Sequence, residues 1–544
     1  MRKLNLNWVT DVIKDDYKKW KCGDVIKIET QTGTGKSAFI VGTKDKTVKG
    51  IVDRLKDEDK LIYICNRLEL KRQIKIDLMK KWDITIPDDV EELDNITTIK
   101  NVTVTSYHAI AYRELESTYK TYNNNLDKYK YIVCDECHYF LTDSSFNNKT
   151  YLALNNLIFK QHKNSIKIFI SATMDEISNA IEVSATKDSD ETCVKSNVYY
   201  YSTSKDYSYL NVKYYKSIKT IQNLIKNDNT ENKWLVFVSS KSKGTEIKKA
   251  LLEGGITAEF IYANAKNKEK ELIRLNSKFN CKVLITTKAL DNGVNIKDEL
   301  VKNIVVESWD KTTFLQEIGR LRFNINNAPT INLFIPTFNS KVFRTKIDKC
   351  YKPKISDLEL FDKDYREFCK KYDNNISKID EEIFYLSSNA EHKWTVNLAG
   401  SVRLYKDNNF AEYMLAKFKE DKQFAYVKEQ LKWLELEDTF DEENLIDNVV
   451  DVVEVKKLEQ FLENMTNKRL YDEEQQILSD LIIKELTTIS KNVDYRTKKL
   501  KPKTLETILR EQLCLNYAVS EVKREDKMVD GKRVRKRYIT IIKL

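Results

Sequence analysis

A glycine-rich loop between an expected strand and an expected helix constrains the fold more than any other stretch of the chain. Val25–Glu29 is a short β-prone run that leads directly into Thr30-Gln31-Thr32-Gly33-Thr34-Gly35-Lys36-Ser37, and a helix is expected immediately afterwards. In this context glycines let backbone N–H groups close around phosphate oxygens, Lys36 adds positive charge, and Ser37 Oγ can coordinate Mg²⁺. A chance Gly-Lys-Ser turn is the alternative. The flanking strand and helix favour a phosphate-binding loop.

A second stretch places carboxylates at the end of another expected strand. Tyr131–Cys134 is apolar and β-prone, as a buried strand should be, and Asp135 and Glu136 follow directly. In an open α/β sheet, ligands bind at the carboxyl ends of the strands. One carboxylate could hold Mg²⁺ while its neighbour takes a proton from water. The two stretches together predict a site that acts on a phosphate ester.

Cys134 and Cys137 have the CxxC spacing of some zinc and redox sites. Such a site needs a second ligand pair or a reactive context, and the two intervening residues here are the Asp-Glu pair itself. The nine cysteines are scattered and odd in number, which in a chain of this length favours reduced thiols over a disulfide framework. We therefore expect no structural zinc and an intracellular protein.

Strands and helices alternate through the first part of the chain. A helix rich in Lys and Arg is expected at Leu68–Lys80. Three further short strands, each followed by polar residues, are expected at Leu61–Cys65, Val102–Thr105 and Ile166–Ile170. This alternation predicts a doubly wound parallel sheet with one working edge.

These stretches resemble the first RecA-like lobe of a superfamily 2 helicase of the DExH group. The resemblance assigns motif I to Thr30–Ser37, motif Ia to Asn66–Leu68, motif II to Asp135–His138 and motif III to Ser171–Thr173. One such motif is a modest signal. Four of them in the family's order and spacing are far more specific.

The family resemblance implies a second RecA-like lobe, and the sequence has its motifs. Leu235–Ser240 is in the position of motif IV, Lys288–Ile296 resembles motif V, and Gln316–Arg322 resembles motif VI. In the family's commonest motif VI the second arginine lies three residues after the first. Here that position is Phe323, and the second arginine is Arg322. The resemblance covers about residues 20–335.

The resemblance implies that ATP lies between the lobes, with Mg²⁺ held by Asp135 and Ser37 and with Glu136 activating the attacking water. His138 and Gln316 would couple the lobes. The implied catalytic residues are Lys36, Asp135, Glu136, His138, Gln316, Arg320 and Arg322. The implied nucleotide-binding residues are Thr32, Gly33, Thr34, Gly35, Lys36, Ser37, Gly293 and Asn295. Contacts with a nucleic-acid strand are implied near Asn66, Arg67, Ser106, Ser239 and Thr286.

The carboxy-terminal part of the chain carries a different pattern. Charged helical stretches follow Phe343, and Leu505–Cys514 has the spacing of an amphipathic helix. Tyr517–Lys523 and Arg533–Ile542 are then expected as strands, joined across Asp530-Gly531, a favoured hairpin turn. A helix followed by a basic hairpin resembles a winged-helix DNA-binding module, whose wing would contact phosphates without reading sequence. The alternative is a solvated basic tail. The basic residues proposed to bind are Lys532, Arg533, Arg535 and Arg537.

The predicted architecture is α/β, with two tandem RecA-like doubly wound parallel-sheet lobes at residues 1–204 and 205–342. A mainly helical accessory region is expected at 343–544, with the basic hairpin near 515–544. The net charge of +10, from 93 basic and 83 acidic residues, suits a polyanionic partner. Abundant Lys, Asn, Tyr and Ile could also reflect an AT-rich genome. We find no long uncharged apolar run and no secretory signal, so we expect a soluble, cytoplasmic protein without membrane contact.

The functional prediction is a nucleic-acid-dependent ATPase that uses ATP and Mg²⁺. We expect a DNA helicase or translocase that serves replication, repair, or a phage or other mobile element. An RNA helicase and an ATP-gated nucleic-acid clamp that does not unwind are the alternatives. A phosphate-loop kinase would not need motifs V and VI.

Overall fold

The computed structural model describes residues 2–544 except for 120–125, 145–146, 148, 187–196, 263–267, 288–294, 373–375, 387–393, 448–457, 490–499, 514 and 530–531. The chain divides into two compact units: Met1–Val212 with Ile225–Phe440, and Lys213–Leu224 with Asp441–Leu544. The predicted limits of the two lobes and of the accessory region divide the chain differently and stay a prediction.

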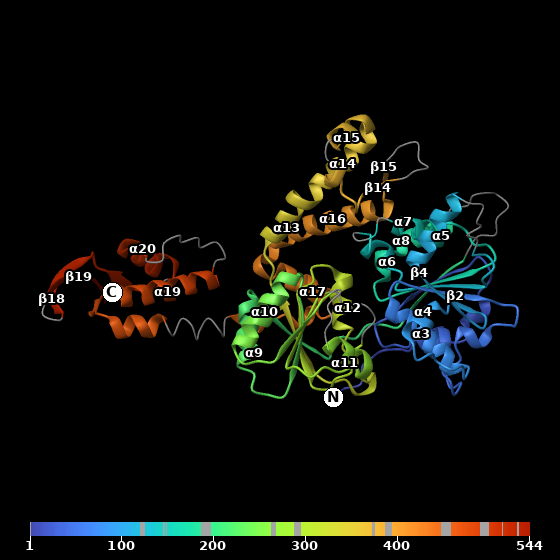
Figure 1. Ribbon diagram of the computed structural model, residues 1–544, viewed down its shortest axis with the longest axis horizontal. Helices are drawn as coiled ribbons and strands as arrows, with labels where there is room; N and C mark the ends of the chain where they lie inside the picture. The colour runs from blue at the N-terminus through green and yellow to red at the C-terminus, as the bar shows by residue number, and fades with distance from the viewer. Residues whose placement is uncertain are drawn as a thin grey trace. The chain divides into compact units, whose positions relative to one another are not determined.

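The first lobe is a seven-stranded sheet in the order β3-β4-β2-β5-β6-β1-β7 (Figure 1). Its strands are β1 Val25–Glu29, β2 Leu61–Cys65, β3 Thr98–Ile99, β4 Val102–Ser106, β5 Tyr131–Asp135, β6 Ile166–Ser171 and β7 Val198–Ser202. Strands β4, β2, β5, β6, β1 and β7 pair in parallel, and β3 pairs antiparallel with β4. The main helices are α1 Val9–Ile13, α2 Lys36–Val41, α3 Leu68–Lys81, α4 Val90–Asn95, α5 Tyr107–Tyr119, α6 Tyr139–Thr142, α7 Thr150–Leu154 and α8 Ser178–Thr186.

Strand β5 shows why the central strands have continuous apolar sequences. Tyr131 and Val133 enter the core shared with α1, α2 and α3, whereas Ile132 and Cys134 enter the core shared with α5, α6 and α7. Successive side chains of a strand point to opposite faces, so a strand covered by helices on both faces must be apolar throughout. The first polar residue, Asp135, therefore comes at the carboxyl end of the strand.

The second lobe is a six-stranded sheet in the order β10-β11-β9-β12-β13-β8. Its strands are β8 Leu210–Tyr215, β9 Lys233–Phe237, β10 Ala258–Ile261, β11 Val283–Thr286, β12 Val301–Val306 and β13 Ile331–Pro336. Strands β10, β11, β9, β12 and β13 pair in parallel. The helices are α9 Ile218–Lys226, α10 Lys241–Glu253, α11 Lys268–Asn276 and α12 Lys311–Ile318. Two parallel-sheet lobes confirm the predicted fold class.

A mainly helical region follows the second lobe, as predicted. It comprises α13 Ser340–Lys346, η7 Ile347–Tyr351, α14 Lys352–Lys363, α15 Tyr365–Tyr372, the strand pair β14 Phe384–Leu386 and β15 Trp394–Val396, α16 Leu398–Asp421 and α17 Ala425–Trp433. Helix α16 is tied to both lobes. Lys406 Nζ donates to the Glu176 carboxylate at 2.8 Å, just after motif III, and Arg403 lies 4.0 Å from Asp310, whose side chain caps α12. This helix therefore joins motif III to the helix of motif VI.

The second unit ends in a small α/β module. Residues 458–465 are helical, and then come β16 Arg469–Leu470, α19 Asp472–Ile489, α20 Pro502–Thr507, η12 Ile508–Gln512, β17 Tyr517–Val519, β18 Lys523–Val529 and β19 Lys532–Lys543. The sheet order is β16-β19-β17, and β18 pairs with β19. Helices α20 and η12 and the hairpin β18–β19 correspond to the predicted helix and hairpin. The module also contains the helix at 458–465, helix α19 and strand β16, and one expected strand is divided into β17 and β18.

The hairpin differs from its prediction in one detail. The run expected as one strand, Tyr517–Lys523, is split into β17 and the start of β18. Val519 pairs with Ile541 but Lys523 pairs with Tyr538, so the register shifts by one residue between them. Such a bulge kinks the strand and increases its twist. The predicted turn Asp530-Gly531 lies outside the described residues, between the paired residues Val529 and Lys532.

Candidate functional site

The loop Thr30–Ser37 runs from the end of β1 to the start of α2. Gly33 and Gly35 have φ of +94° and +86°, a left-handed conformation that residues with a Cβ rarely adopt. Thr34 Oγ1 donates to the carbonyl of Gln31 at 2.8 Å and lies 2.7 Å from Thr30 Oγ1. A Cβ on Gly35 would lie 2.8 Å from the ring of Trp8. Backbone conformation therefore requires both glycines, and lack of space also requires the one at Gly35.

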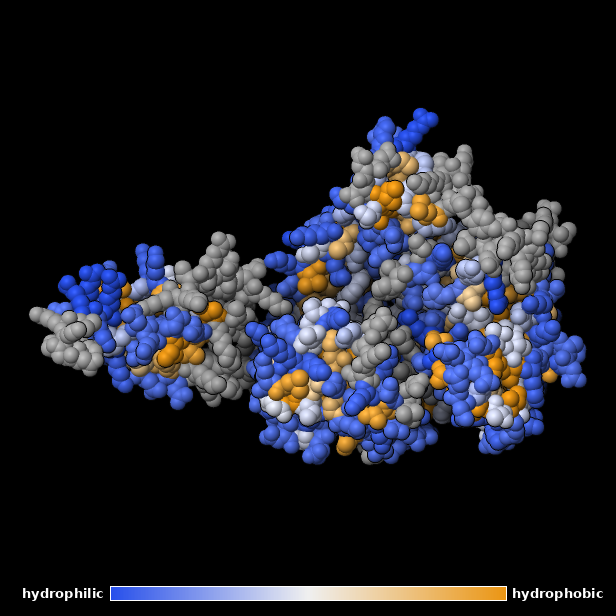
Figure 2. All heavy atoms as spheres, in the orientation of Figure 1, coloured by the Kyte–Doolittle hydropathy of each residue, from blue (hydrophilic) through white to orange (hydrophobic). Residues whose placement is uncertain are grey.

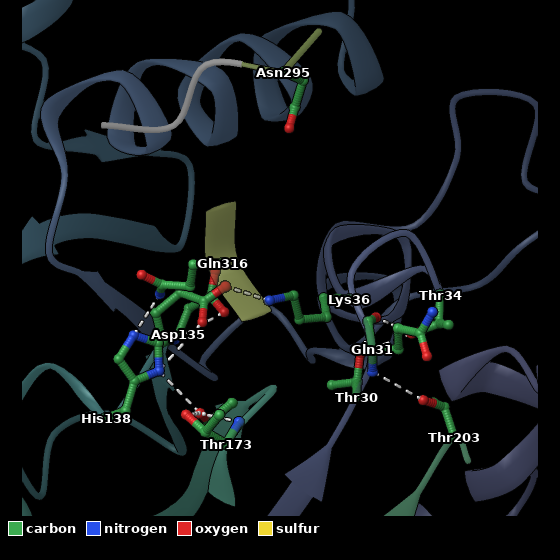
Figure 3. A network of polar contacts seen from close by, with 12 residues as sticks. Thr30, Gln31, Thr34, Lys36, Asp135, His138, Thr173, Thr203, Asn295 and Gln316 are labelled. Carbon is green, nitrogen blue, oxygen red and sulfur yellow. Dashed lines mark hydrogen bonds and ion pairs between the residues drawn. The ribbon is translucent and has the colours of Figure 1, made fainter. Parts of the chain in front are cut away.

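Residues distant in the sequence hold this loop from outside. The Val9 N–H donates to the Thr34 carbonyl at 3.0 Å. The Gln31 side chain donates to the Asp206 carbonyl at 3.0 Å and accepts from the Asp206 N–H at 2.8 Å. The Gln31 N–H donates to Thr203 Oγ1 at 3.3 Å (Figure 3). Sequence reasoning missed Gln31 because its partners lie far along the chain. The only sequence signal for these contacts was the presence of a glutamine inside the loop.

The two consecutive carboxylates face different partners. Lys36 Nζ forms an ion pair with Glu136 Oε1. Asp135 is buried and accepts hydrogen bonds from the hydroxyl of Tyr63 and from the N–H of Glu136. Glu136 has φ of +52°, which is uncommon for a residue other than glycine. Its second oxygen, Oε2, is buried without a hydrogen-bond partner among the described residues, as expected of a group whose partner is a water or a substrate.

The charges of this cluster depend on burial and on one another. Burial raises the pKa of Asp135. Burial acts in the same direction on Glu136, but the charge and hydrogen bond of Lys36 together with His138 and Arg320 outweigh it and lower the pKa of Glu136 to about 2. Burial would lower the pKa of Lys36, but the negative charges of Glu136 and Asp135 raise it. At neutral pH, Glu136 is therefore ionised and Lys36 is charged.

His138 connects this cluster to the second lobe. Its ring is buried, with 2 % of its surface exposed, and burial lowers the pKa of the imidazole, so the ring is neutral. Gln316 Nε2, from α12, lies 2.7 Å from His138 Nε2, and Ser171 Oγ lies 2.9 Å from His138 Nδ1 (Figure 3). If the amide N–H donates to Nε2, the ring proton is on Nδ1 and is donated to Ser171. The predicted link between His138 and Gln316 is present in the structure.

Motif VI touches the phosphate loop directly. A Cβ on Gly319 would lie 2.6 Å from Thr32 Oγ1, so only glycine allows this approach. Thr312 Oγ1 donates to Thr173 Oγ1 at 3.2 Å, which adds a second buried hydrogen bond between the lobes. The two lobes are therefore closed on each other around the loop.

The two arginines of motif VI face the same cluster. Arg322 Nε donates to Asn295 Oδ1 at 2.9 Å, and Arg322 Nη1 would lie 3.7 Å from a Cβ on Gly33. Burial, followed by the positive charge of Arg320, lowers the pKa of Arg322 to about 10. The positive charge of Arg320 also lowers the pKa of Glu136. Two cations near the phosphate loop make a place for a polyanion.

The residues predicted to contact a nucleic-acid strand lie in different surroundings. Arg67 pairs with Asp143 at 3.4 Å, and Ser106 Oγ accepts the N–H of Ala109 at the start of α5. Asn66 is half-buried and Ser239 is exposed. Thr286 is fully buried and its hydroxyl donates to the Thr287 carbonyl. In the hairpin, Arg535 and Arg537 are exposed, and the side chains of Lys532 and Arg533, like Gly293 of motif V, lie outside the described residues.

The residues present fit a magnesium ion held by few protein ligands. Asp135 offers a buried carboxylate and Ser37 a hydroxyl at the first turn of α2, which is the ligand set that Mg²⁺ takes when phosphates and water complete its shell. No group of three or more His, Cys, Asp or Glu suited to a metal occurs in the described part of the chain. No helix there is long and apolar enough to cross a membrane.

Two family models match the chain: DEAD/DEAH box helicase over residues 12–181 and helicase conserved C-terminal domain over residues 216–324. With the two parallel-sheet lobes, they define a nucleic-acid-dependent ATPase of the helicase class. The chain belongs to the superfamily 2 DEAD/DEAH box helicases. No curated protein matches it in sequence.

Several solved structures are similar to the chain at low identity. Dbp5 from S. cerevisiae bound to RNA and ADP BeF3 is 18% identical, over 57% of this chain and 79% of Dbp5, with a TM-score of 0.40. Helicase Lhr of Mycobacterium smegmatis bound to ssDNA and AMP-PNP is 13% identical, over 60% and 45%, with a TM-score of 0.38. The helicase MrfA bound to DNA is 14% identical, over 60% and 48%, with a TM-score of 0.41.

Proposed function

We propose that this protein is an ATP-dependent DNA helicase or translocase that hydrolyses ATP with Mg²⁺ between its two lobes. The observation that supports this most directly is one chain of contacts. It runs from Lys36 of the phosphate loop to its ion-pair partner Glu136, whose Oε2 lies 3.5 Å from His138 Nδ1, and from His138 by a hydrogen bond to Gln316 of the second lobe. A phosphate-binding group, a base and a bond between the lobes are thereby linked within one network.

The side chains have distinct roles in this proposal. The backbone of Thr32–Ser37 and the Lys36 ammonium would bind the phosphates, and Ser37 with Asp135 would hold Mg²⁺. Mg²⁺, when bound, would neutralise charge on the outer phosphates. Arg320 and Arg322 would stabilise the charge that spreads over the transferred phosphoryl group, with Asn295 orienting Arg322. Glu136 would orient the attacking water and accept its proton.

The Lys36–Glu136 ion pair gives this base a simple control. In the structure the Lys36 ammonium neutralises the Glu136 carboxylate. The phosphates of ATP would compete for Lys36 and leave Glu136 Oε1 available to water, beside Oε2, which has no hydrogen-bond partner among the described residues and lies 3.5 Å from His138 Nδ1. A carboxylate released from its cation is a better proton acceptor, because the nearby positive charge is what holds its pKa low. The base would therefore become active when the substrate is bound.

The hydrogen bond between Gln316 and His138 would couple hydrolysis to movement of a strand. Gln316 belongs to the second lobe and His138 follows the catalytic carboxylates of the first, so closing of the lobes makes this bond and opening breaks it. Contacts near Asn66, Arg67, Ser106, Ser239 and Thr286 would then bind and release the strand alternately.

DNA is proposed as the substrate, in replication, repair, or a phage or mobile-element process in the cytoplasm. The support comes from the exposed arginines Arg535 and Arg537 on the carboxy-terminal hairpin, which offer charge to a phosphate backbone, together with the net charge of +10.

The test is steady-state ATP hydrolysis titrated with single-stranded DNA, duplex DNA and RNA of equal length, together with ATP-driven strand displacement. We expect DNA to stimulate turnover more than RNA. Lys36→Ala and Glu136→Gln should each abolish the stimulated turnover, and Lys311→Ala, which removes an exposed ion pair between the lobes, serves as the control. Near-normal turnover in the Glu136 variant would contradict the site assignment. ATP hydrolysis without strand displacement would identify a clamp or translocase instead of a helicase.

A further inference from the structure

Helix α20 and its continuation η12 carry a basic face on the carboxy-terminal module. Leu505, Ile508 and Leu509 are buried in the core of the module. The opposite face exposes Lys503, Thr507 and Arg510, spaced four and three residues apart. Lys503 and Thr507 lie one turn apart on the same side of α20, and Arg510 is exposed on the π-helical turn η12 that continues it. The exposed side of this helical segment, which runs eleven residues from Pro502 to Gln512, therefore carries hydrogen-bond donors along its length.

The hairpin β18–β19 extends this surface with arginines. Ile539 and Ile541 of β19 are buried in the same core as the helices. Alternate residues of a strand share a face, so Arg537 and Arg535 continue the helix-facing side of β19 beyond the point where the core ends. Both are exposed, Arg535 with 70 % of its side chain accessible. Strongly hydrophilic surface lies over the described part of this hairpin (Figure 2).

Two of these arginines directly oppose each other. Arg524 of β18 pairs with Arg537 of β19 in the antiparallel register, and both are exposed. Like charges at directly opposed positions destabilise a two-stranded ribbon. An arrangement that costs stability in the free module is relieved when an anion binds between the two guanidinium groups. This pair therefore indicates a polyanionic ligand more specifically than a scattered positive charge does.

We propose that the carboxy-terminal module binds B-form duplex DNA. The exposed face of α20–η12 lies in the major groove, and the arginine face of the hairpin binds the adjacent phosphates. A helix with its side chains is about 10–12 Å across and the major groove of B-DNA is about 12 Å wide, so the helix fits. This inference rests on DNA being the substrate in the proposed function and adds a second, duplex-binding site outside the two lobes.

The geometry favours duplex DNA over duplex RNA. The major groove of A-form RNA is deep and too narrow for a helix, so the face of Lys503, Thr507 and Arg510 could not enter it. Two carboxylates lie near the basic surface: Glu506, 3.3 Å from Arg510, and Asp526, 3.9 Å from Arg535. They offset part of the charge and fix the two arginines in place. The net charge of this surface remains positive.

The experiment measures binding of the full chain to a duplex DNA of about three helical turns by fluorescence anisotropy, without nucleotide, over a series of salt concentrations. The variants are Lys503→Ala with Arg510→Ala, and Arg535→Ala with Arg537→Ala. We expect each pair to weaken duplex binding at least tenfold near 0.1 M salt and to reduce the slope of log K against log salt by about 1 to 2. Duplex RNA of the same length should bind less tightly than duplex DNA.

The matched control is Lys468→Ala with Lys536→Ala. Both residues are exposed and the pair removes the same charge, but Lys536 lies on the opposite face of β19 from Arg535. Equal losses in the control and test pairs would overturn the inference, as would unchanged duplex binding in the test pairs or tighter binding of RNA. ATP hydrolysis stimulated by single-stranded DNA should persist in Lys503→Ala with Arg510→Ala. Its absence in the unsubstituted chain would instead contradict the proposed function.

Discussion

Replacing Gln316 by leucine tests the proposed coupling between the two lobes. The side chains have similar volume, and the change removes the donor that faces His138 Nε2 at 2.7 Å. His138 is 2 % exposed, so water cannot easily replace the lost donor. A buried acceptor left without a partner costs about 1–3 kcal/mol. The closed arrangement of the lobes should weaken by that amount, which is roughly 5- to 150-fold in the closing equilibrium.

The assay is the affinity for single-stranded DNA with and without a non-hydrolysable ATP analogue. The ratio of the two affinities measures the coupling, and it is reciprocal, so either ligand can be titrated. We expect the ratio to fall by roughly 5- to 150-fold in Gln316→Leu, with little change in the affinity without analogue. Unwinding should fall more than basal ATP hydrolysis. Lys311→Ala is the control, because its ion pair with Asp175 is exposed and contributes about 1 kcal/mol at most.

A double-mutant cycle with His138→Ala identifies the bond itself. If the two side chains act through their hydrogen bond, the double variant should lose no more coupling than the more affected single variant. Losses that add in full would mean that the residues act separately. An unchanged affinity ratio in Gln316→Leu would refute the reasoning altogether.

Two further predictions follow from other parts of the first unit. Arg322→Lys keeps the charge but loses the planar contact with Asn295, so we expect kcat to fall by ~100-fold or more while the affinity for an ATP analogue changes little; equal losses in both would indicate a binding role alone. Burial lowers the pKa of Lys167 on β6 to about 8, so below pH 8 the folded protein bears the cost of a buried ammonium, about 3 kcal/mol. Between pH 8 and the ordinary value of 10.5, the folded state releases this proton while the unfolded state keeps it, so the free energy of unfolding rises with pH. Lys167→Met should therefore be more stable at pH 7 in urea denaturation, and its advantage should disappear by pH 10.5; an advantage independent of pH would contradict this account.

The central strands of the first lobe could be predicted closely from sequence. The bounds of β1 and β2 agree with the prediction, because both strands are buried on both faces and bounded by polar residues. The side chains Lys36, Asp135, Glu136, His138 and Gln316 come together as expected, although their catalytic roles stay predictions. Polar motifs at the ends of parallel strands must meet at one edge of the sheet. A local pattern is therefore enough to place them.

Contacts between distant segments could not be predicted in the same way. Gln31 binds Asp206, and Lys406 of α16 binds Glu176, through hydrogen bonds that no local spacing encodes. The exact ends of β17 and β18 depend on a register shift against β19. Single-sequence patterns report which face of an element is apolar. They do not report which segment will pair with it.

The unusual spacing of motif VI has a structural explanation. Helix α12 ends at Ile318, Gly319 and Arg320 form a turn, and Leu321 then makes an isolated parallel bridge with Ile296. In this bridge the Ile296 N–H donates to the Arg320 carbonyl at 2.9 Å, and the Ile296 carbonyl accepts from the Arg322 N–H at 2.8 Å. Residues two apart point to the same side of an extended chain, whereas on a helix they point to different sides. Arg320 and Arg322 therefore both face the phosphate loop.

Phe323, where the family's commonest form has its second arginine, instead packs against Tyr209 with ring centroids 4.8 Å apart. An arginine at that position in this backbone would lie against Tyr209. The shift of the second arginine by one residue and the β-bridge at Leu321 thus compensate for each other. Two guanidinium groups are kept beside the phosphate loop, and this supports Arg322 as the second arginine of the proposed mechanism.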